Sequence, residues 1–412
     1  MENQNKIAPA KAGAALRGFA DAANAGFGAL RAGAKQVHQA FGGEYGDKFA
    51  GTLKNEEGNY VIPDPLVDER EYEEIATLTK RYEKALAPGP IAKAGKAIIE
   101  KTPQPVKEIA GKAGNAVKDT FNGLTEQELI AGAIKKATEG FGELEKHAAR
   151  ASVSKEYVLQ RINSGKQEQK VSDISEICML RSYDVAAIAN DEHLQHIGIA
   201  AVEGGGTGAA GFWGLPANFA LSMLIYFRAV QSVALFYGYD VKSNPDELVI
   251  SSEVFSKAMS PNAENTAAND YVGKILVYTE MAGVRKAAAK TWTAMIESGG
   301  AALVLTQMRA MANRAAQKAL EKGGQKALEA GIFKKTLAQI GRKLSLKTIG
   351  KMVPFVGAGF GALFDTAQMS QVLKIADLFY HKRFILEKQE RIERLCGQGM
   401  RNVSETDNEH VE

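Results

Sequence analysis

An uncharged, glycine-rich stretch is the feature that most constrains how this chain can fold. Residues 204–227 contain no Asp, Glu, Lys or Arg, although these four residue types make up 24% of the 412 residues. Glycines are concentrated in its first half, Pro216 interrupts the middle, and a nearly all-apolar helical pattern follows. Small residues allow helix backbones to approach closely, both in soluble cores and in membranes. The stretch therefore predicts a close helix contact or contact with lipid, and it indicates no particular reaction.

The same stretch is long enough to cross a membrane, but its composition argues against a permanent span. A single helix of this length would be about 36 Å long, against a hydrocarbon core of about 30 Å. Its glycines, Pro216 and Asn218 would interrupt that helix, and Arg228 and Gln231 follow directly. Polar side chains of this kind are poorly tolerated on a lipid-facing helix. We expect burial in a helical core, ahead of reversible insertion and well ahead of stable spanning.

The rest of the chain shows helical signals and no alternating strand pattern. Apolar residues recur at spacings of three and four from residue 68 to the breaker at residues 88–90, and again across residues 171–200. A capping box opens a helix at residues 125–128, and Asn244-Pro245 is a strong helix start. A long helical run reaches about residue 350, with breaks at residues 299–300 and 323–324. The sequence predicts an all-α, multi-helix bundle with close-packed Gly-rich helical segments.

Composition divides the chain into three parts and suggests its compartment. We expect a Gly/Ala-rich arm and linker at residues 1–66, a helical domain at residues 67–396, and an acidic, disordered tail at residues 397–412. Cys178 and Cys396 are the only cysteines. Two distant thiols form neither a disulfide framework nor a four-cysteine zinc site, and the N-terminus lacks an apolar signal region. We expect a cytoplasmic protein, with Cys178 packed as a small hydrophobic residue.

Charge is unevenly distributed although the formal net charge is only +3. Residues 309–351 hold eleven Lys and Arg against two Glu, a local net charge of +9. Phe333, Leu337, Ile340 and Leu344 give this region an amphipathic helical face. The bases around it are the predicted anionic-lipid contacts: Lys334, Lys335, Arg342, Lys343 and Lys347. The other interpretation is a helix docked on the core with its basic face in water. Nucleic acid is not expected, because aromatic residues are not interleaved with the bases.

Two motifs suggest enzyme chemistry but fit it poorly. Residues 206–211 read G-x-G-x-x-G, yet Asp240 lies too far along the chain for a dinucleotide site, and Pro216 would break the required helix. His193 and His196 could share a helix face, but no third metal ligand stands at suitable spacing. We therefore expect no metal and no cofactor, and catalytic residues are unknown. His381, beside Lys382-Arg383, is predicted to lie on a solvated helix face.

Two blocks of sequence resemble a known family. They are GIAAVEGGGTGAAGFWGLPANF…VALFYGYD at residues 198–240 and GKMVPFVGAGFGALFDTA at residues 350–367. Their order and flanking helices resemble the bacterial EcsC protein family over residues 68–395. In the first block the predicted packing residues are Gly204, Gly206, Gly208, Gly211, Gly214 and Pro216. In the second block they are Pro354, Gly357, Gly359 and Gly361.

The resemblance implies a helical architecture and no agreed activity or catalytic residues. The family typically has Asp after the Pro-Ala of the first block, where this chain has Asn218. Its namesake is encoded beside an ABC transporter, which implies a link to membrane transport. We therefore expect a non-catalytic helical protein that contacts the inner membrane face or a membrane-transport protein. The alternative is an enzyme that uses the Gly-rich loop 204–214 or the His193/His196 pair.

Overall fold

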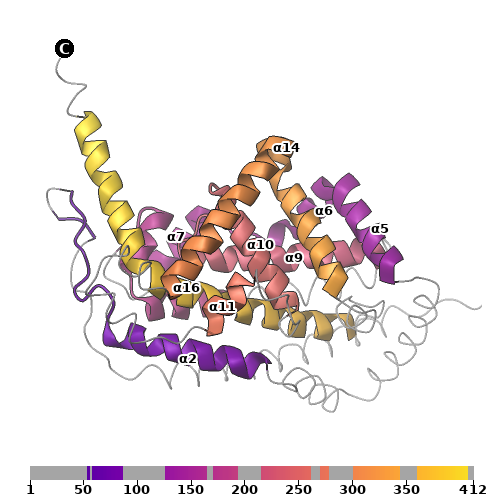
Figure 1. Ribbon diagram of the computed structural model, residues 1–412, viewed down its shortest axis with the longest axis horizontal. Helices are drawn as coiled ribbons and strands as arrows, with labels where there is room; N and C mark the ends of the chain where they lie inside the picture. The colour runs from indigo at the N-terminus through magenta and orange to yellow at the C-terminus, as the bar shows by residue number, and fades with distance from the viewer. Residues whose placement is uncertain are drawn as a thin grey trace, which may run out of the picture.

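The chain folds into helices. The computed structural model describes residues 53–55, 58–86, 126–164, 170–193, 215–260, 270–277, 300–343 and 360–406. Within these ranges the pairing of extended segments is limited to an isolated antiparallel bridge between Lys54 and Tyr60. The predicted all-α, multi-helix class is confirmed (Figure 1).

The helix boundaries follow the local signals in the sequence. The α-helices that precede the glycine-rich block are α2 (Glu69–Leu86), α5 (Glu126–Glu139), α6 (Phe141–Ala148) and α7 (Lys155–Asn163). Those that follow it are α9 (Leu215–Phe236), α10 (Pro245–Met259), α11 (Tyr271–Val277), α14 (Ala301–Lys343) and α16 (Phe360–Thr406). Two 3-10 helices, η1 (Ala149–Ala151) and η2 (Ile174–Met179), and a helical segment at residues 182–193 complete the described elements.

Helix α9 forms the centre of the core. It contacts α5, α6, α7, α10, α14 and α16 (Figure 1). By length and composition Pro216–Phe236 could cross a membrane, but the whole of its most apolar window is buried inside the protein. Burying one large apolar side chain contributes about 1.5–3 kcal/mol, so a helix apolar on every side is stabilised by being enclosed. Residues 217–227 thus pack in the helical core, as predicted, whereas residues 204–214 lie outside the described part.

The polar residues of α9 are bonded to neighbouring helices. The Arg228 guanidinium lies 2.8 Å from Glu145 Oε1 in α6 and 2.9 Å from Glu329 Oε1 in α14. The Gln231 amide donates to the same Glu329 oxygen at 2.9 Å. Because buried charges are tolerated when they are paired, these contacts allow α9 to carry Arg228 through the core. They also fix α14 relative to α9.

Helices α14 and α16 are the longest described elements. Gly324, with φ of 64° and ψ of 177°, interrupts α14, so that two helical arms meet at residues 323–324 as the sequence predicted. The arms form a hairpin over α10, with its tip directed away from the body (Figure 1). On the other side of the molecule α16 packs between α9 and α2. Its C-terminal end extends beyond the other helices.

The predicted helix across residues 171–200 was wrong in part. Asp173 is extended and caps η2 through a reciprocal capping box with Glu176. The chain is extended again at Leu180 before helix resumes at residues 182–193. Side chains of Asp and Ser compete for backbone N–H groups, which favours this break over a continuous helix. The helix start predicted at Asn244-Pro245 is present, because α10 begins at Pro245. The Asn244 side chain, however, makes no capping hydrogen bond.

Close helix packing occurs at glycines that the sequence motifs did not single out. A Cβ atom on Gly132 of α5 would lie 2.9 Å from Cβ of Pro216 in α9. A Cβ on Gly341 of α14 would lie 2.6 Å from a side-chain carbon of Ile130 in α5. Helix α5 therefore approaches α9 and α14 through one glycine contact on each side. Pro216 belongs to the first sequence block, and its ring lies against Gly132.

Replacing Gly132 with alanine tests this packing. The Pro216 ring cannot rotate away, so the added methyl group of Gly132→Ala overpacks this contact. Alanine also favours the helix more than glycine does, which offsets part of that cost. The free energy of unfolding should therefore fall by about 1 kcal/mol. Gly142→Ala is the matched control, because no atom lies within 4 Å of its added Cβ. Urea denaturation of both variants checks the prediction. Equal or greater stability of Gly132→Ala relative to Gly142→Ala would contradict it.

Candidate functional site

The helix α16 carries a row of charged and polar side chains that face the interior of the protein. His381, Lys382 and Arg383 were predicted to be solvated, and that prediction was wrong, because all three are buried. Four further charged side chains of this enclosed part of the helix are also buried: Asp377, Glu387, Lys388 and Arg391. The sequence pattern resembles a solvated face because the partners that satisfy these groups lie on other helices, far away in the sequence.

Arg383 is at the centre of this row. Its guanidinium pairs with both carboxylate oxygens of Glu247 in α10, at 2.6 and 2.7 Å. Its Nε also donates to Glu387 Oε2 at 3.1 Å. Such bidentate pairs are among the strongest charge-assisted hydrogen bonds. Together they attach α16 to α10.

Glu387 joins α14 to the same cluster. The Arg309 guanidinium lies 2.9 Å from Glu387 Oε2, and the Tyr239 hydroxyl donates to that oxygen at 3.1 Å. Burial alone would raise the pKa of Glu387, but Arg309 and Arg383 outweigh it and lower the pKa to about 2. Glu387 is therefore a buried carboxylate held ionised by its neighbours, and that role is structural.

A second cluster attaches α16 to α2. The Lys388 ammonium donates to Glu71 Oε1 at 2.7 Å, and both side chains are fully buried. Arg181 Nη1 lies 3.3 Å from the other Glu71 oxygen, and the Ser182 backbone N–H donates to Glu71 at 2.8 Å. Burial lowers the pKa of Lys388, and Glu71 opposes that effect. The carboxylate of Glu71 thus holds three separate segments together.

The outer surface of α14 has a different electrostatic character. Six of its cations are exposed and have no ion pair or hydrogen bond among the described residues. We call them the cationic hairpin face: Arg314, Lys318 and Lys322 on the first arm, and Lys334, Lys335 and Arg342 on the second. The apolar side of the second arm is buried through Phe333, Leu337 and Ile340, as its spacing predicted.

The two acids near these cations do little to neutralise them. Glu329 points inward and pairs with Arg228 of α9. Glu321, near the hairpin tip, is the remaining described acid of α14, and it is exposed. Glu329 is therefore paired in the core, and the outer face of the hairpin remains strongly positive.

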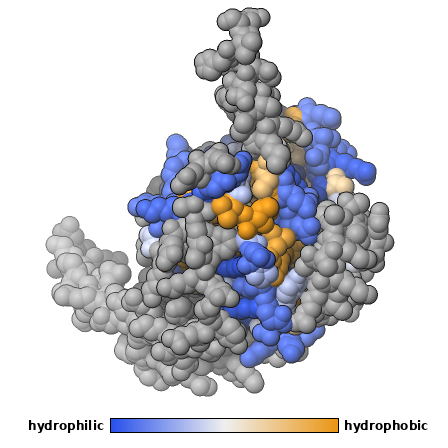
Figure 2. Space-filling view, turned by 90° about the vertical axis from the view of Figure 1, so that its left-hand side faces the viewer, coloured by the Kyte–Doolittle hydropathy of each residue, from blue (hydrophilic) through white to orange (hydrophobic). Residues whose placement is uncertain are grey.

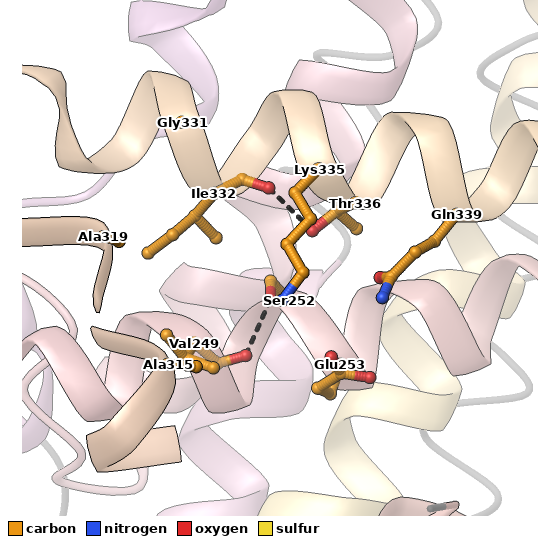
Figure 3. A pocket seen from close by; sticks show the side chains of 10 residues that line it. All are labelled: Val249, Ser252, Glu253, Ala315, Ala319, Gly331, Ile332, Lys335, Thr336 and Gln339. Atoms are coloured by element: carbon orange, nitrogen blue, oxygen red, sulfur yellow. Dashed lines mark hydrogen bonds between the residues drawn. The ribbon is translucent and has the colours of Figure 1, made fainter. Parts of the chain in front are cut away.

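A crevice between the hairpin arms and α10 is too small for an organic ligand. Its volume is about 60 Å³, and its walls include Ala315 and Ala319 from the first arm, Ile332 and Lys335 from the second, and Val249 from α10 (Figure 3). The nearby hydroxyls are satisfied locally, since Ser252 donates to Val249 O and Thr336 donates to Ile332 O. One water occupies about 30 Å³ of liquid, so the crevice suits a water or two.

The remaining predicted site residues are only partly covered by the structure. Lys343 ends α14, and Gly361 lies in the first turn of α16. The residues that lie outside the described part are Gly204, Gly206, Gly208, Gly211, Gly214, Pro354, Gly357, Gly359, Lys347 and His196. His193 is partly buried and ends the helical segment at residues 182–193. Among the described residues no group of three or more His, Cys, Asp or Glu is placed to hold a metal.

These features define the class of protein. It is an all-α protein whose buried apolar helix is surrounded by helices, held by internal ion pairs, and flanked by a basic hairpin. Residues 71–385 match the EcsC protein family, so the chain belongs to this family. No curated protein and no solved structure matches the chain.

Removing the charge of Glu71 tests the α2–α16 cluster. Glu71→Gln leaves Lys388 and Arg181 without their shared carboxylate, and breaking a buried pair in this way costs about 3–5 kcal/mol. Glu73→Gln is the matched control, since Glu73 is exposed on the same helix, and it should change stability by less than about 0.5 kcal/mol. Chemical denaturation measures both. Similar values for the two variants would show that the cluster does not stabilise the fold.

Lys382 should make stability depend on pH. It donates to Thr79 Oγ1 and Leu276 O, and burial lowers its pKa from 10.5 to about 7. Below pH 7 the amine is protonated in both folded and unfolded protein, and the cost of burying its charge is present in full. Between pH 7 and 10.5 the unfolded protein binds more protons, so the free energy of unfolding rises with pH.

The comparison with Lys382→Met isolates this group. The variant should be more stable than the parent at about pH 6, and its advantage should shrink by about pH 9, as the parent's buried amine loses its proton. Urea titrations at both pH values measure the difference. A constant difference would mean that Lys382 does not titrate in this range.

Proposed function

We propose that this protein is a non-catalytic helical protein that binds an anionic membrane surface through the cationic hairpin face. The observation that carries the proposal is the set of six exposed cations on α14 without ion partners in the described part of the chain. Cations that stabilise a fold are paired inside it, as Arg228 and Arg383 are. Unpaired cations gathered on one hairpin are available to an external partner.

Electrostatic attraction of this size is sufficient for reversible binding. Each Lys or Arg near an anionic membrane contributes about 1 kcal/mol, and the attraction falls off within a Debye length. Six such residues, opposed by Glu321, would contribute about 5 kcal/mol, a dissociation constant of about 0.2 mM before the cost of immobilisation. Binding of this kind weakens as salt increases.

The apolar residues favour peripheral contact over insertion. Helix α9 is enclosed by protein, so it is not free to enter a bilayer while the fold is intact. The exposed large apolar side chains in the described ranges are few: Val61, Ile62, Val277 and Met311. Figure 2 shows a compact apolar area bordered by hydrophilic residues among the described residues at the end of the molecule that faces the viewer. Of these four exposed apolar residues, Met311 lies on the first hairpin arm, close in sequence to the cationic hairpin face.

The proposal includes a location and an alternative partner. A basic surface of this kind suits the inner face of the cell membrane, where anionic lipids are exposed to cytoplasmic proteins. An acidic patch on a membrane-transport protein would satisfy the same cations, and the experiment below separates the two. Within the described residues no observation favours the enzyme alternative, whose Gly-rich loop 204–214 and His196 lie outside them.

Vesicle flotation tests the proposal. The full chain should float with vesicles that contain phosphatidylglycerol at low salt, bind more as the anionic fraction rises, and dissociate at high salt. Replacing Lys318, Lys322, Lys334 and Lys335 with Gln removes four charges from the hairpin and should weaken binding by about 4 kcal/mol, on the order of a thousandfold.

A second variant with the same change in net charge is the control. Lys80 and Lys84 in α2 and Lys135 and Lys136 in α5 are all exposed, and their replacement by Gln should leave most of the binding intact. Equal weakening by the two variants would show that net charge alone governs binding. Failure of the parent protein to bind anionic vesicles at low salt would refute the lipid proposal and leave an acidic protein as partner.

A further inference from the structure

A larger cavity lies where four distant parts of the chain meet. Its volume is about 300 Å³, the lower end of the range for small-molecule sites. One wall is formed by Arg309 of α14 and by Arg391 and Arg394 of α16. The rest of the lining comes from the start of η2, the turn after α9 and the beginning of α10: Asp173, Ile174, Ser175, Gly238, Tyr239, Asp240, Asn244 and Glu247. We call it the arginine cavity.

Arg391 is a buried cation of this wall without an ion pair in the described part of the chain. Its Nη1 and Nη2 atoms donate to the carbonyl oxygens of Tyr237 and Gly238, at 3.0 and 2.9 Å. Its guanidinium also lies over the Tyr239 ring, 4.4 Å from the centroid. These contacts fix the position of the group without a direct ion pair, and only 8% of Arg391 is exposed.

The local backbone is built to hold Arg391 there. Gly238 has a φ of 76°, and a Cβ atom at this position would lie 2.4 Å from Arg391 Nη2. A glycine is therefore required both by the turn and by the approach of the guanidinium. The turn presents two successive carbonyl oxygens to a single arginine, so the position of the cation is set by backbone geometry.

The ion pairs around the cavity do not include Arg391. The four guanidinium groups of Arg309, Arg383, Arg391 and Arg394 meet three carboxylates, those of Glu247, Glu387 and Glu390. Arg309 and Arg394 share Glu390, whereas Arg391 forms no ion pair in the described part of the chain. The cavity lining also includes the carboxylates of Asp173, Asp240 and Glu247, equal in number to its three arginines. A buried cation without a direct counter-ion is costly, and an anion bound beside Arg391 would reduce that cost.

The rest of the lining is polar and includes Asp173, Asp240 and Asn244. Asp240 pairs with Lys155 and accepts hydrogen bonds from the backbone N–H groups of Lys242 and Ser243. Asp173 accepts from Ser175 N at 2.8 Å. The amide of Asn244 does not cap α10 and is exposed at the cavity. These oxygens and this amide can bond the hydroxyl groups of a ligand whose anionic end meets the arginines.

We propose that the arginine cavity binds a small phosphate-bearing ligand, with the phosphate between Arg391 and Arg394 and hydroxyl groups toward Asn244 and Asp240. A phosphate presents several acceptor oxygens and matches the planar fork of more than one arginine. This site is separate from the cationic hairpin face: it recognises one phosphate group, whereas the hairpin responds to the charge of a surface.

Calorimetric titration of the full chain tests the site with inorganic phosphate and with glycerol 3-phosphate, at constant ionic strength set by chloride. Both should bind saturably at one site. Arg394→Gln should weaken both at least tenfold, and this side chain is more than half exposed, so the fold does not depend on it. Arg391→Lys keeps the charge but loses the fork, and it should weaken both similarly. Asn244→Ala should weaken glycerol 3-phosphate and leave inorganic phosphate unchanged.

The combined Lys334→Gln and Lys335→Gln variant is the control for general electrostatics, and its phosphate binding should equal that of the parent. Vesicles that contain phosphatidylglycerol distinguish a lipid headgroup from a free ligand. If they displace phosphate, and if Arg394→Gln weakens vesicle binding, the phosphate group belongs to a lipid; otherwise it belongs to a soluble ligand. Absence of saturable phosphate binding, or equal binding by the parent and Arg394→Gln, would overturn the proposal.

Discussion

The pairing of Arg383 with Glu247 and Glu387 is the interaction on which the arrangement of the helices most depends. A charged helix face inside a protein is tolerated only where every group meets a partner, so each neighbour of α16 must supply one at a fixed position. Glu247 does so from α10, Arg309 from α14 and Glu71 from α2. Sliding any of these helices by one turn would leave a buried charge unpaired. The ion pairs thus select one register of packing, whatever their net contribution to stability.

This constraint also explains how charge is divided between the inside and outside of α14. Arg309, near the start of α14, pairs with Glu387 and Glu390. Glu329, in the second arm of α14, pairs with Arg228. The six cations of the cationic hairpin face have no internal partner among the described residues and are exposed. Inside the molecule, two backbone carbonyl oxygens hold Arg391 at the cavity, where it forms no direct ion pair in the described part of the chain. The cationic hairpin face and Arg391 thus lie outside the internal ion pairs.

The sequence predicted what depends on local pattern and missed what depends on distant partners. The extent of α2, the start of α10, the break near Gly324 and the buried side of α14 followed from periodicity and from helix-start and helix-break signals. Burial of His381, Lys382 and Arg383 did not, because Glu74, Thr79 and Glu247 lie more than one hundred residues away. The exposed Lys334, Lys335 and Arg342 were predicted from spacing. The arginine cavity could not be, because four distant segments form it.

A double-mutant cycle on Arg383 and Glu247 tests the central claim most directly, with both residues replaced by Met singly and together. If the pair sets the packing of α16 on α10, each single replacement leaves an unpaired buried charge and costs about 3–5 kcal/mol. The double variant should then be more stable than the sum of the two losses predicts, with a coupling energy of at least about 1 kcal/mol. Additive losses would contradict the account, because they would mean that the two side chains act independently.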